Sequence, residues 1–317
     1  MKITVLDTST LGDDIDLSKL SEIGNTEFFG LTSQEEVPER IKNCEVIITN
    51  KVKLNRENLH GAKNLKLICV TATGYDNIDI EYCNLHNIRV CNVVGYSTDS
   101  VAQVTVCSVL ALATHLNEYT EYVKSGEYSA SGCANKVSPV FHELGGKTWG
   151  IIGYGNIGRK VAQIAKAFGC KVIANKRTPC DDIDCVDFKT LCQSSDIISI
   201  HTPLTNETRE LINKSSIALM KPDAILYNAS RGAVTNEKDV AEAIITKKIA
   251  AFGSDVYSVE PLQTDNPLYV IKNYPNVCLT PHMAWASFEA RRLCIDEVIE
   301  NIKAFERGEK RNTITKQ

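Results

Sequence analysis

The chain has 317 residues, of which 43% are hydrophobic and 23% are charged, and its formal net charge is −4. This length is typical of two domains, and this composition is typical of a globular protein with a buried core. The negative charge argues against a nucleic-acid partner, and no run of about 18 apolar residues is present to span a membrane. The N-terminal stretch MKITVLDTST has too short an apolar run for a signal peptide, so we expect a cytoplasmic protein.

Twelve cysteines are a high number and need an interpretation. No two of them form a CxxC pair, and the closest group, Cys180, Cys185 and Cys192, has wider gaps than zinc sites usually show. A chain of this size does not depend on disulfides either. We therefore expect no metal site, and we expect reduced, mostly buried thiols that behave as small hydrophobic side chains. The sequence leaves open whether any of them has a redox role.

Strand and helix patterns alternate along the first part of the chain. Short apolar runs bounded by polar residues predict strands within 2–7, 45–49, 65–70 and 88–93. A long apolar segment from about 99 to 122 predicts one buried helix. The small and polar residues of 125–136 predict a loop or arm.

A second series of strands and helices follows, and it ends in one long helix. The predicted strands lie within 147–155, 170–175, 196–203, 224–230, 249–256 and 276–282. The stretch 287–308 has apolar residues at helical spacing. Alternating strands and helices predict parallel sheets covered by helices on both faces. Two such series predict two α/β domains, joined near 97–100 and again around 281–287.

A glycine-rich turn connects the first strand and helix of the second series. Gly153, Gly155 and Gly158 have the GxGxxG spacing, with the strand TWGII before them and an apolar-periodic helix after them. In this context the glycines allow a tight turn, a close approach to a pyrophosphate and close packing of helix on strand. The helix N-terminus then faces the phosphates. The alternative is a tight turn without a ligand.

The end of the next strand is the position that contacts the adenosine ribose of a bound dinucleotide, and it usually carries an acid. Here the sequence is ANKRT, with Lys176, Arg177 and Thr178 and no acid. An acid would bond the 2′-hydroxyl and repel a 2′-phosphate, whereas two cations favour the phosphate. We therefore predict a preference for NADP(H) over NAD(H). The alternative is that these side chains lie in solvent and that either cofactor is used.

Polar side chains with catalytic chemistry follow three later strands. Arg231 lies in NASRGAV, Asp255 and Glu260 lie in GSDVYSVEP, and His282 lies in TPHMAWAS. Reduction of a ketone needs a hydride and a proton, and an imidazolium donates protons near neutral pH. Glu260 would orient the ring of His282 and favour its charged form. Arg231 would hold a substrate carboxylate and polarise the carbonyl group.

Seven motifs occur in an order that resembles the D-isomer-specific 2-hydroxyacid dehydrogenase family over nearly the whole chain. They are VTATGYDNID (70–79), SVAQVT (100–105), GYGNIG (153–158), HTPLTNETRELIN (201–213), NASRGA (228–233), DVYSVEP (255–261) and PHMAWAS (281–287). The resemblance implies an enzyme with Arg231, Glu260 and His282 as its catalytic set. It also implies that Asp255 faces the nicotinamide carboxamide.

The resemblance implies two Rossmann-like, doubly wound parallel-sheet domains with the active site in the cleft between them. Residues 1–98 and 286–317 would form a discontinuous substrate domain, and 99–285 would form the dinucleotide-binding domain. The segment 125–145 and the interdomain helix would form a homodimer contact, as in relatives. Closure of the cleft would exclude water from the reaction.

The same resemblance implies a set of ligand-binding residues. The cofactor, NADP or NAD, would contact Thr105, Gly153, Gly155, Asn156, Ile157, Gly158, Lys176, Arg177, Thr178, His201, Thr202, Pro203, Thr208, Ala229, Ser230, Arg231, Asp255 and His282. The substrate would contact Ala72, Thr73, Gly74, Arg231, His282 and Trp285.

Trp285 narrows the branch of the family. A tryptophan after the catalytic histidine resembles the glycerate dehydrogenase/hydroxypyruvate reductase branch, in which hydroxypyruvate or glyoxylate is reduced to a D-2-hydroxyacid. The alternative is that Trp285 packs in a core. We expect no carboxy-terminal regulatory domain of the phosphoglycerate dehydrogenase kind. The sequence leaves open which 2-oxoacid is used, the direction of the reaction in the cell and a firm choice between the two cofactors.

Three other functions remain as alternatives. A formate dehydrogenase of the same fold would not need an acid–base pair such as Glu260 and His282, which argues against it. A cofactor-sensing corepressor-like protein would bind the nucleotide without turnover, but it would need partner-binding tails. A dehydrogenase for a bulkier 2-oxoacid would use the same carboxylate and ketone chemistry.

Overall fold

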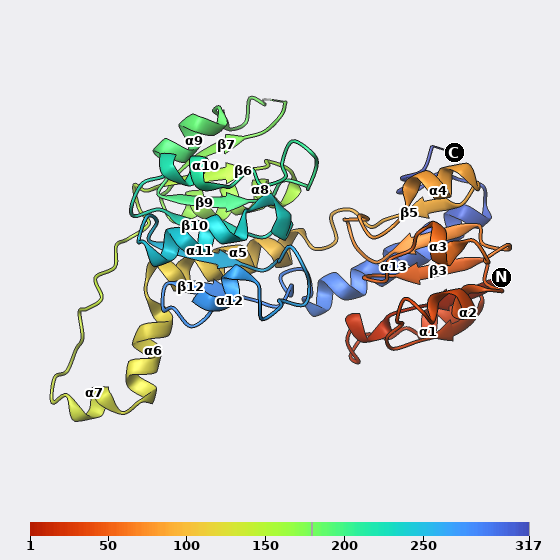
Figure 1. The fold of residues 1–317 in the computed structure, drawn as a ribbon, viewed down its shortest axis with the longest axis horizontal. Coiled ribbons are helices and arrows are strands. Elements are labelled where there is room, and N and C mark those ends of the chain that lie inside the picture. Colours follow the sequence, from red (N-terminus) through yellow and green to blue (C-terminus); the bar gives the residue numbers. More distant parts are fainter. Residues whose placement is uncertain (179, 317) are drawn as a thin grey trace. The chain divides into compact units, whose positions relative to one another are not determined.

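The computed structural model describes residues 1–178 and 180–316. The chain divides into two units, one formed by Met1–Ser97 with Ala286–Gln317 and the other by Thr98–Trp285. Each unit contains one parallel β-sheet (Figure 1). The prediction of two α/β domains built on parallel sheets is therefore confirmed, while their roles in binding substrate and cofactor stay predictions.

The first unit is built on a five-stranded sheet with the order β2-β1-β3-β4-β5. The strands are β1 Lys2–Val5, β2 Asn25–Phe28, β3 Val46–Thr49, β4 Leu67–Val70 and β5 Arg89–Cys91, and all pairs are parallel. Every residue of β3 and β4 is buried, as expected of central strands with helices on both faces. The sequence did not predict β2, because this edge strand is mostly exposed and has no apolar pattern.

Short helices and one long helix complete the first unit. They are η1 Thr8–Thr10, α1 Ser18–Glu22, α2 Val37–Ile41, α3 Arg56–Leu59, α4 Ile80–Leu85 and α13 Phe288–Glu306. The long helix α13 begins after Ser287, whose hydroxyl accepts a hydrogen bond from the Ala290 N–H and caps the helix. Its buried face includes Cys294, Val298 and Ile302, so the helical spacing read from the sequence marks the core face.

The second unit is built on a seven-stranded sheet with the order β12-β11-β10-β9-β6-β7-β8. The strands are β6 Thr148–Ile152, β7 Lys171–Asn175, β8 Asp184–Cys185, β9 Ile197–Ile200, β10 Ile225–Asn228, β11 Ala251–Ser254 and β12 Val277–Leu279. From β6 the chain adds β7 and β8 on one side, then continues with β9 on the other side. Ligands of such sheets bind at the carboxyl ends of the strands beside this reversal.

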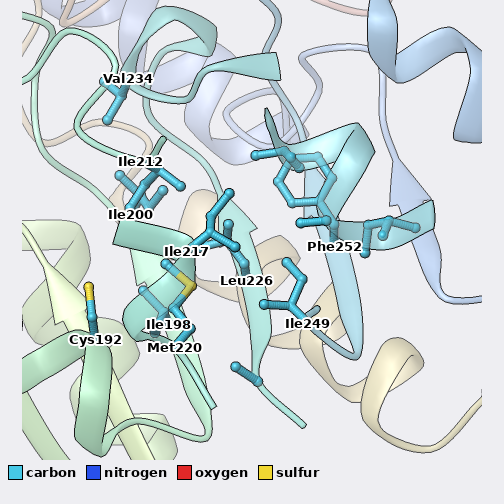
Figure 2. Packing of buried hydrophobic residues seen from close by; sticks show 14 of the residues in the cluster. Cys192, Ile198, Ile200, Ile212, Ile217, Met220, Leu226, Val234, Ile249 and Phe252 are labelled. Atoms are coloured by element: carbon cyan, nitrogen blue, oxygen red, sulfur yellow. The ribbon is translucent and has the colours of Figure 1, made fainter. Parts of the chain in front are cut away.

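The second unit also contains helices, most of which cover its sheet. They are α5 Thr98–Ala113, α6 Leu116–Lys124, α7 Glu127–Ala130, α8 Asn156–Ala167, α9 Phe188–Ser194, α10 Lys214–Leu219, η2 Gly232–Val234, α11 Glu237–Ile245 and α12 Pro267–Ile271. Figure 2 shows Ile217 of α10 and Met220, which follows this helix, beside Ile198 of β9 and Leu226 of β10 in one apolar cluster. This packing holds the strand ends, and the loops that follow them, in fixed positions.

One helix prediction was wrong. The segment from 99 to 122 forms two helices, α5 and α6, which meet at a bend of 67°. His115 lies at the bend in the left-handed region with φ of +52°, and its Nδ1 lies 2.7 Å from the Glu118 carboxylate. None of the residues of α6 is buried, and α6 and α7 project away from the sheet (Figure 1). In the described residues no single helix has the length and apolar character of a membrane span; the bent pair α5 and α6 meets those criteria only jointly.

The cysteines lie mostly in the cores, as predicted. Seven are buried, three are partly exposed, and two, Cys107 and Cys133, are exposed; all twelve are free thiols. Burial raises the pKa of the thiols of Cys44 and Cys83 to about 12, so these side chains act as small apolar residues. Cys180 and Cys185 are two of the three partly exposed ones, with their Sγ atoms 4.0 Å apart.

Candidate active site

The glycine turn lies between β6 and α8, at the reversal of strand order. Gly153 has φ of +94°, and a Cβ there would lie 2.5 Å from the Thr202 N–H nitrogen, so the turn itself requires glycine. A Cβ at Gly155 would meet no atom within 4 Å. Packing within the protein therefore does not explain Gly155. The open space beside it fits a ligand that approaches the backbone, which favours the phosphate-binding interpretation over a tight turn without a ligand.

The first turn of α8 provides hydrogen-bond donors for such a ligand. Gly155 is the N-cap residue and has no side chain that could accept from the helix. Helix geometry leaves the first backbone N–H groups, those of Asn156, Ile157 and Gly158, without intrahelical acceptors. Together with the positive end of the helix dipole, they suit the pyrophosphate of a dinucleotide.

Two polar side chains of the second unit have buried atoms without hydrogen-bond partners among the described residues. They are His201, at the end of β9, through both ring nitrogens, and Thr105, on α5, through its hydroxyl. The backbone N–H of His201 donates to the Ile152 carbonyl at 2.7 Å, which fixes the residue next to the glycine turn. Burial lowers the pKa of His201 to about 3, so the ring is neutral. Unsatisfied buried polar atoms of this kind fit a bound cofactor that would supply the partners.

The loop that follows His201 is held by its own side chains. Thr208 Oγ1 donates to the Pro203 carbonyl at 2.7 Å and accepts from the Thr205 N–H at 2.7 Å. The predicted contact residues Thr202, Pro203 and Thr208 thus belong to one ordered loop at the carboxyl end of β9. Their contacts with a cofactor stay predictions.

The three residues expected at the ribose lie directly after β7. Lys176 is half-buried, whereas Arg177 and Thr178 are exposed. The Asn175 side chain donates to the Val186 carbonyl at 3.0 Å and holds the strand end in place. Glu207 lies in the loop after β9, and its pKa is lowered mainly by the Thr205 hydroxyl and further by the charge of Arg177. The charge of Arg177 therefore acts on an acid of the neighbouring loop.

His282 and Glu260 form the pair that the sequence predicts. His282 Nδ1 lies 2.8 Å from Oε1 and 2.7 Å from Oε2 of Glu260, and both side chains are partly exposed. Glu260 Oε1 also accepts a hydrogen bond from the Tyr257 N–H at 3.2 Å. A carboxylate at Nδ1 fixes the orientation of the ring and leaves Nε2 as the atom that can exchange a proton with a ligand.

Asp255 anchors the turn that carries His282. It is buried, with 2% of its surface exposed. Its Oδ1 accepts from the Thr280 hydroxyl at 2.6 Å and from the Met283 N–H at 2.9 Å, and its Oδ2 accepts from the Ala284 N–H at 2.8 Å. These donors lie on both sides of His282, whose φ is +53°. This anchoring role of Asp255 could not be predicted from the sequence, because hydrogen bonds to backbone groups leave no sequence signal.

Arg231 lies on the loop after β10, beside the loop of Glu260. A Cβ at Gly232 would lie 1.9 Å from the Tyr257 carbonyl carbon, so only glycine lets the two loops approach so closely. Asn228 organises the Arg231 loop: its Oδ1 accepts from the Ser230 N–H at 3.0 Å and its Nδ2 donates to the Arg231 carbonyl at 3.0 Å. Arg231, Glu260 and His282 are therefore all carried by loops at the carboxyl edge of the second sheet.

The predicted substrate loop lies in the first unit, at the carboxyl end of β4. Thr73 Oγ1 donates to the Val93 carbonyl at 2.8 Å, and Asn92 Nδ2 donates to the Thr73 carbonyl at 2.7 Å. The backbone carbonyl of Ala72 accepts from the Val93 N–H at 3.0 Å. The segment Ala72–Gly74 is thus held by the chain that follows β5, and its contacts with a substrate stay predictions. Trp285, the last residue of the second unit, is half-buried.

Comparisons with known proteins agree with this arrangement. Residues 106–284 match the model of the D-isomer specific 2-hydroxyacid dehydrogenase, NAD binding domain. The chain is 35% identical to a hydroxypyruvate reductase of Blautia hydrogenotrophica, with full coverage of both chains. It is 38% identical to a glyoxylate reductase of Thermococcus litoralis, covering 86% of this chain and 83% of the relative.

The solved structure of an acyclic imino acid reductase, determined with NADPH and D-Arg, is similar with a TM-score of 0.89 at 30% identity. The match covers 99% of this chain and 100% of that one. The resemblance read from the motifs is confirmed, and so are the Rossmann-type fold and the assignment as an NAD(P)-dependent oxidoreductase. This chain belongs to the D-isomer-specific 2-hydroxyacid dehydrogenase family.

Proposed function

We propose that this enzyme reduces a small 2-oxoacid, hydroxypyruvate or glyoxylate, to the corresponding D-2-hydroxyacid. The contact between His282 and Glu260 carries the proposal, because it joins a proton donor to the carboxylate that orients it. The names of the relatives, hydroxypyruvate reductase and glyoxylate reductase, support the choice of substrate. The contact also argues against formate oxidation, which needs no such pair.

Each side chain of the catalytic set has one task. When bound, the nicotinamide cofactor supplies the hydride. His282 delivers the proton from Nε2 to the substrate oxygen, while Glu260 accepts from Nδ1 and balances the positive ring. Arg231 holds the substrate carboxylate and polarises the carbonyl group. Asp255 keeps the His282 turn in place through the Met283 and Ala284 N–H groups.

The cofactor in this proposal is NADP(H) by preference. The first turn of α8 takes the pyrophosphate, and His201 and Thr105 supply the polar side chains whose partners the cofactor provides. Lys176, Arg177 and Thr178 offer donors to a 2′-phosphate, and NADPH bound to the similar imino acid reductase supports this choice.

A comparison of kcat/KM for NADPH and NADH tests the cofactor preference. We expect NADPH to be favoured, and the double substitution K176A/R177A to lower kcat/KM for NADPH by about a hundredfold while that for NADH changes little. The double variant K247A/K248A alters two cations between α11 and β11, at the amino-terminal edge of the second sheet, and serves as a control. A wild-type preference for NADH would contradict the proposal.

The substrate in this proposal is small, because the family resemblance puts Trp285 beside the substrate, where its wide ring would narrow the pocket. We expect glyoxylate and hydroxypyruvate to be turned over faster than branched 2-oxoacids, with D-glycerate as the product of hydroxypyruvate on a chiral column. Trp285→Gly should raise kcat/KM for branched substrates. If Trp285 only packs a core, the same substitution lowers the melting temperature and leaves the ranking of substrates unchanged.

We further propose that the enzyme is a homodimer in which an arm, made of α6 and the segment 125–145, contacts a second copy. The arm exposes the large apolar side chains Leu116, Val123, Tyr128, Val137, Val140 and Phe141. A groove lined by Val106, Leu110 and Ile164 of α5 and α8 offers an apolar surface on the same unit. Analytical ultracentrifugation should give a dimer for the wild type and a monomer for V140D/F141D. A monomeric wild type would contradict this assignment.

A further inference from the structure

We propose that Cys180 and Cys185 form a reversible disulfide that weakens binding of the 2′-phosphorylated cofactor. Their Sγ atoms are 4.0 Å apart, and both side chains are partly exposed, so small oxidants can reach them. A disulfide bond is about 2.05 Å long, so its formation needs an approach of about 2 Å. The inference about the cofactor rests on the proposed use of NADP(H), whereas the inference about the disulfide does not.

The thiol pair adjoins the segment that is proposed to bind the 2′-phosphate. Cys180 follows Thr178 by two positions in the sequence, and Cys185 is the last residue of the edge strand β8. Ala174 of β7 is the register partner of Cys185, and the Val186 N–H donates to the Ala174 carbonyl at 2.9 Å. Cys185 is therefore fixed to the sheet, so the approach must move Cys180 and the chain that leads to it.

Asp182 links this segment to the glycine turn. Its carboxylate accepts hydrogen bonds from Arg159 of α8 and, at 3.5 Å, from the Tyr154 hydroxyl. Tyr154 lies between Gly153 and Gly155, and its ring faces the Arg159 guanidinium at 4.6 Å. A change at Cys180 thus reaches both the ribose end and the phosphate end of the proposed cofactor site.

The reaction is a thiol–disulfide exchange with a low-molecular-weight disulfide such as oxidised glutathione. A hydrogen bond to Asp182 raises the pKa of Cys180, so we assign the first attack to Cys185. The Cys185 thiolate attacks one sulfur of the oxidant, forms a mixed disulfide and releases one thiol. Cys180 then loses its proton to solvent, attacks the Cys185 sulfur and expels the second thiol. Two protein thiols are oxidised and one disulfide is reduced to two thiols.

Trypsin cleavage after Arg177 and Lys189 gives one peptide, TPCDDIDCVDFK, that contains both thiols and no other cysteine. After treatment with oxidised glutathione, this peptide should lose two hydrogen atoms in mass and resist alkylation, and dithiothreitol should reverse the change. NADPH fluorescence should show a dissociation constant raised about tenfold in the oxidised protein, with NADH affinity changed less than twofold.

C180S and C185S should each abolish the change in affinity, whereas C133S, which removes an exposed thiol elsewhere, should keep it. If both cysteines of the peptide can still be alkylated after oxidation, the proposal that Cys180 and Cys185 form a disulfide is wrong. A mapped disulfide with unchanged NADPH affinity would overturn its effect on the cofactor. If the reduced protein binds no NADPH, the proposed use of NADPH is wrong. The mass of the peptide still shows in that case whether the disulfide forms.

Discussion

Replacing Asp255 by asparagine tests how the His282 turn is held. Asp255 accepts three hydrogen bonds, two at Oδ1 and one at Oδ2. The amide oxygen of asparagine can keep the two bonds from Thr280 and Met283, but the amide NH2 then faces the Ala284 N–H, and two donors oppose each other. The loss of one charge-assisted bond in a buried site costs about 1.5–3 kcal/mol. For a unit of the size of Thr98–Trp285, this corresponds to a melting temperature lowered by about 3–12 °C.

The kinetic effect of D255N should appear in kcat. A displaced His282 delivers its proton poorly, and a misplacement of about 1 Å can cost up to a hundredfold in rate. We therefore expect kcat to fall about ten- to a hundredfold, with the KM for NADPH changed less than threefold. If Asp255 serves mainly the nicotinamide carboxamide, the KM for the cofactor rises instead and kcat changes little. The exposed Asp223, changed to asparagine, is the matched control. If D255N has the same melting temperature and the same kcat as the wild type, the anchoring role of Asp255 is refuted.

Two further predictions concern the cofactor turn. Gly153→Ala should lower the melting temperature strongly, because its Cβ would lie 2.5 Å from the Thr202 nitrogen, whereas Gly155→Ala should leave stability unchanged and raise the KM for the cofactor. Equal losses of stability in both variants would contradict this division. Burial lowers the pKa of His201 to about 3 in the folded protein, so between pH 7 and pH 5 the histidine binds a proton only in the unfolded protein. The free energy of unfolding of the cofactor-free protein should therefore fall by about 2 kcal/mol when the pH is lowered from 7 to 5. Urea unfolding of the wild type and H201Q at both pH values measures this change in the free energy of unfolding, and the contribution of His201 should be absent in H201Q. An equal pH dependence of the two proteins would show that His201 is not the group responsible.

Local patterns explain which parts of the fold could be predicted from the sequence. Apolar runs such as VIIT and LICV form wholly buried strands, so their hydrophobicity alone marks them. The edge strands β2 and β8 were missed, because exposed strands carry mixed residues and gain their order from pairing with a neighbour. The bend at His115 was missed because apolar and aromatic residues recur at helical spacing beyond it in α6, where none of them is buried.

In the candidate active site, too, the residue types could be predicted from the sequence, but the contacts with backbone groups could not. The pairing of His282 with Glu260 followed from residue types at strand ends, because parallel strands bring their carboxyl ends together. The contacts of Asp255 with the Met283 and Ala284 N–H groups could not be predicted, because any residue supplies a backbone N–H. The proximity of Cys180 and Cys185 depends on the path of the loop between β7 and β8, which has no periodic pattern.

The most direct test of the proposed function is turnover of glyoxylate and hydroxypyruvate with NADPH by the wild type, H282Q and E260Q, with NADPH affinity measured by fluorescence in each. We expect the wild type to oxidise NADPH in the presence of a 2-oxoacid, and kcat to fall by about a thousandfold in H282Q and about a hundredfold in E260Q. The dissociation constant of NADPH should stay within threefold of wild type in both variants. A kcat of H282Q within tenfold of wild type would contradict the proton-donor role of His282. A wild-type protein that binds NADPH and turns over no 2-oxoacid would contradict the proposed function itself.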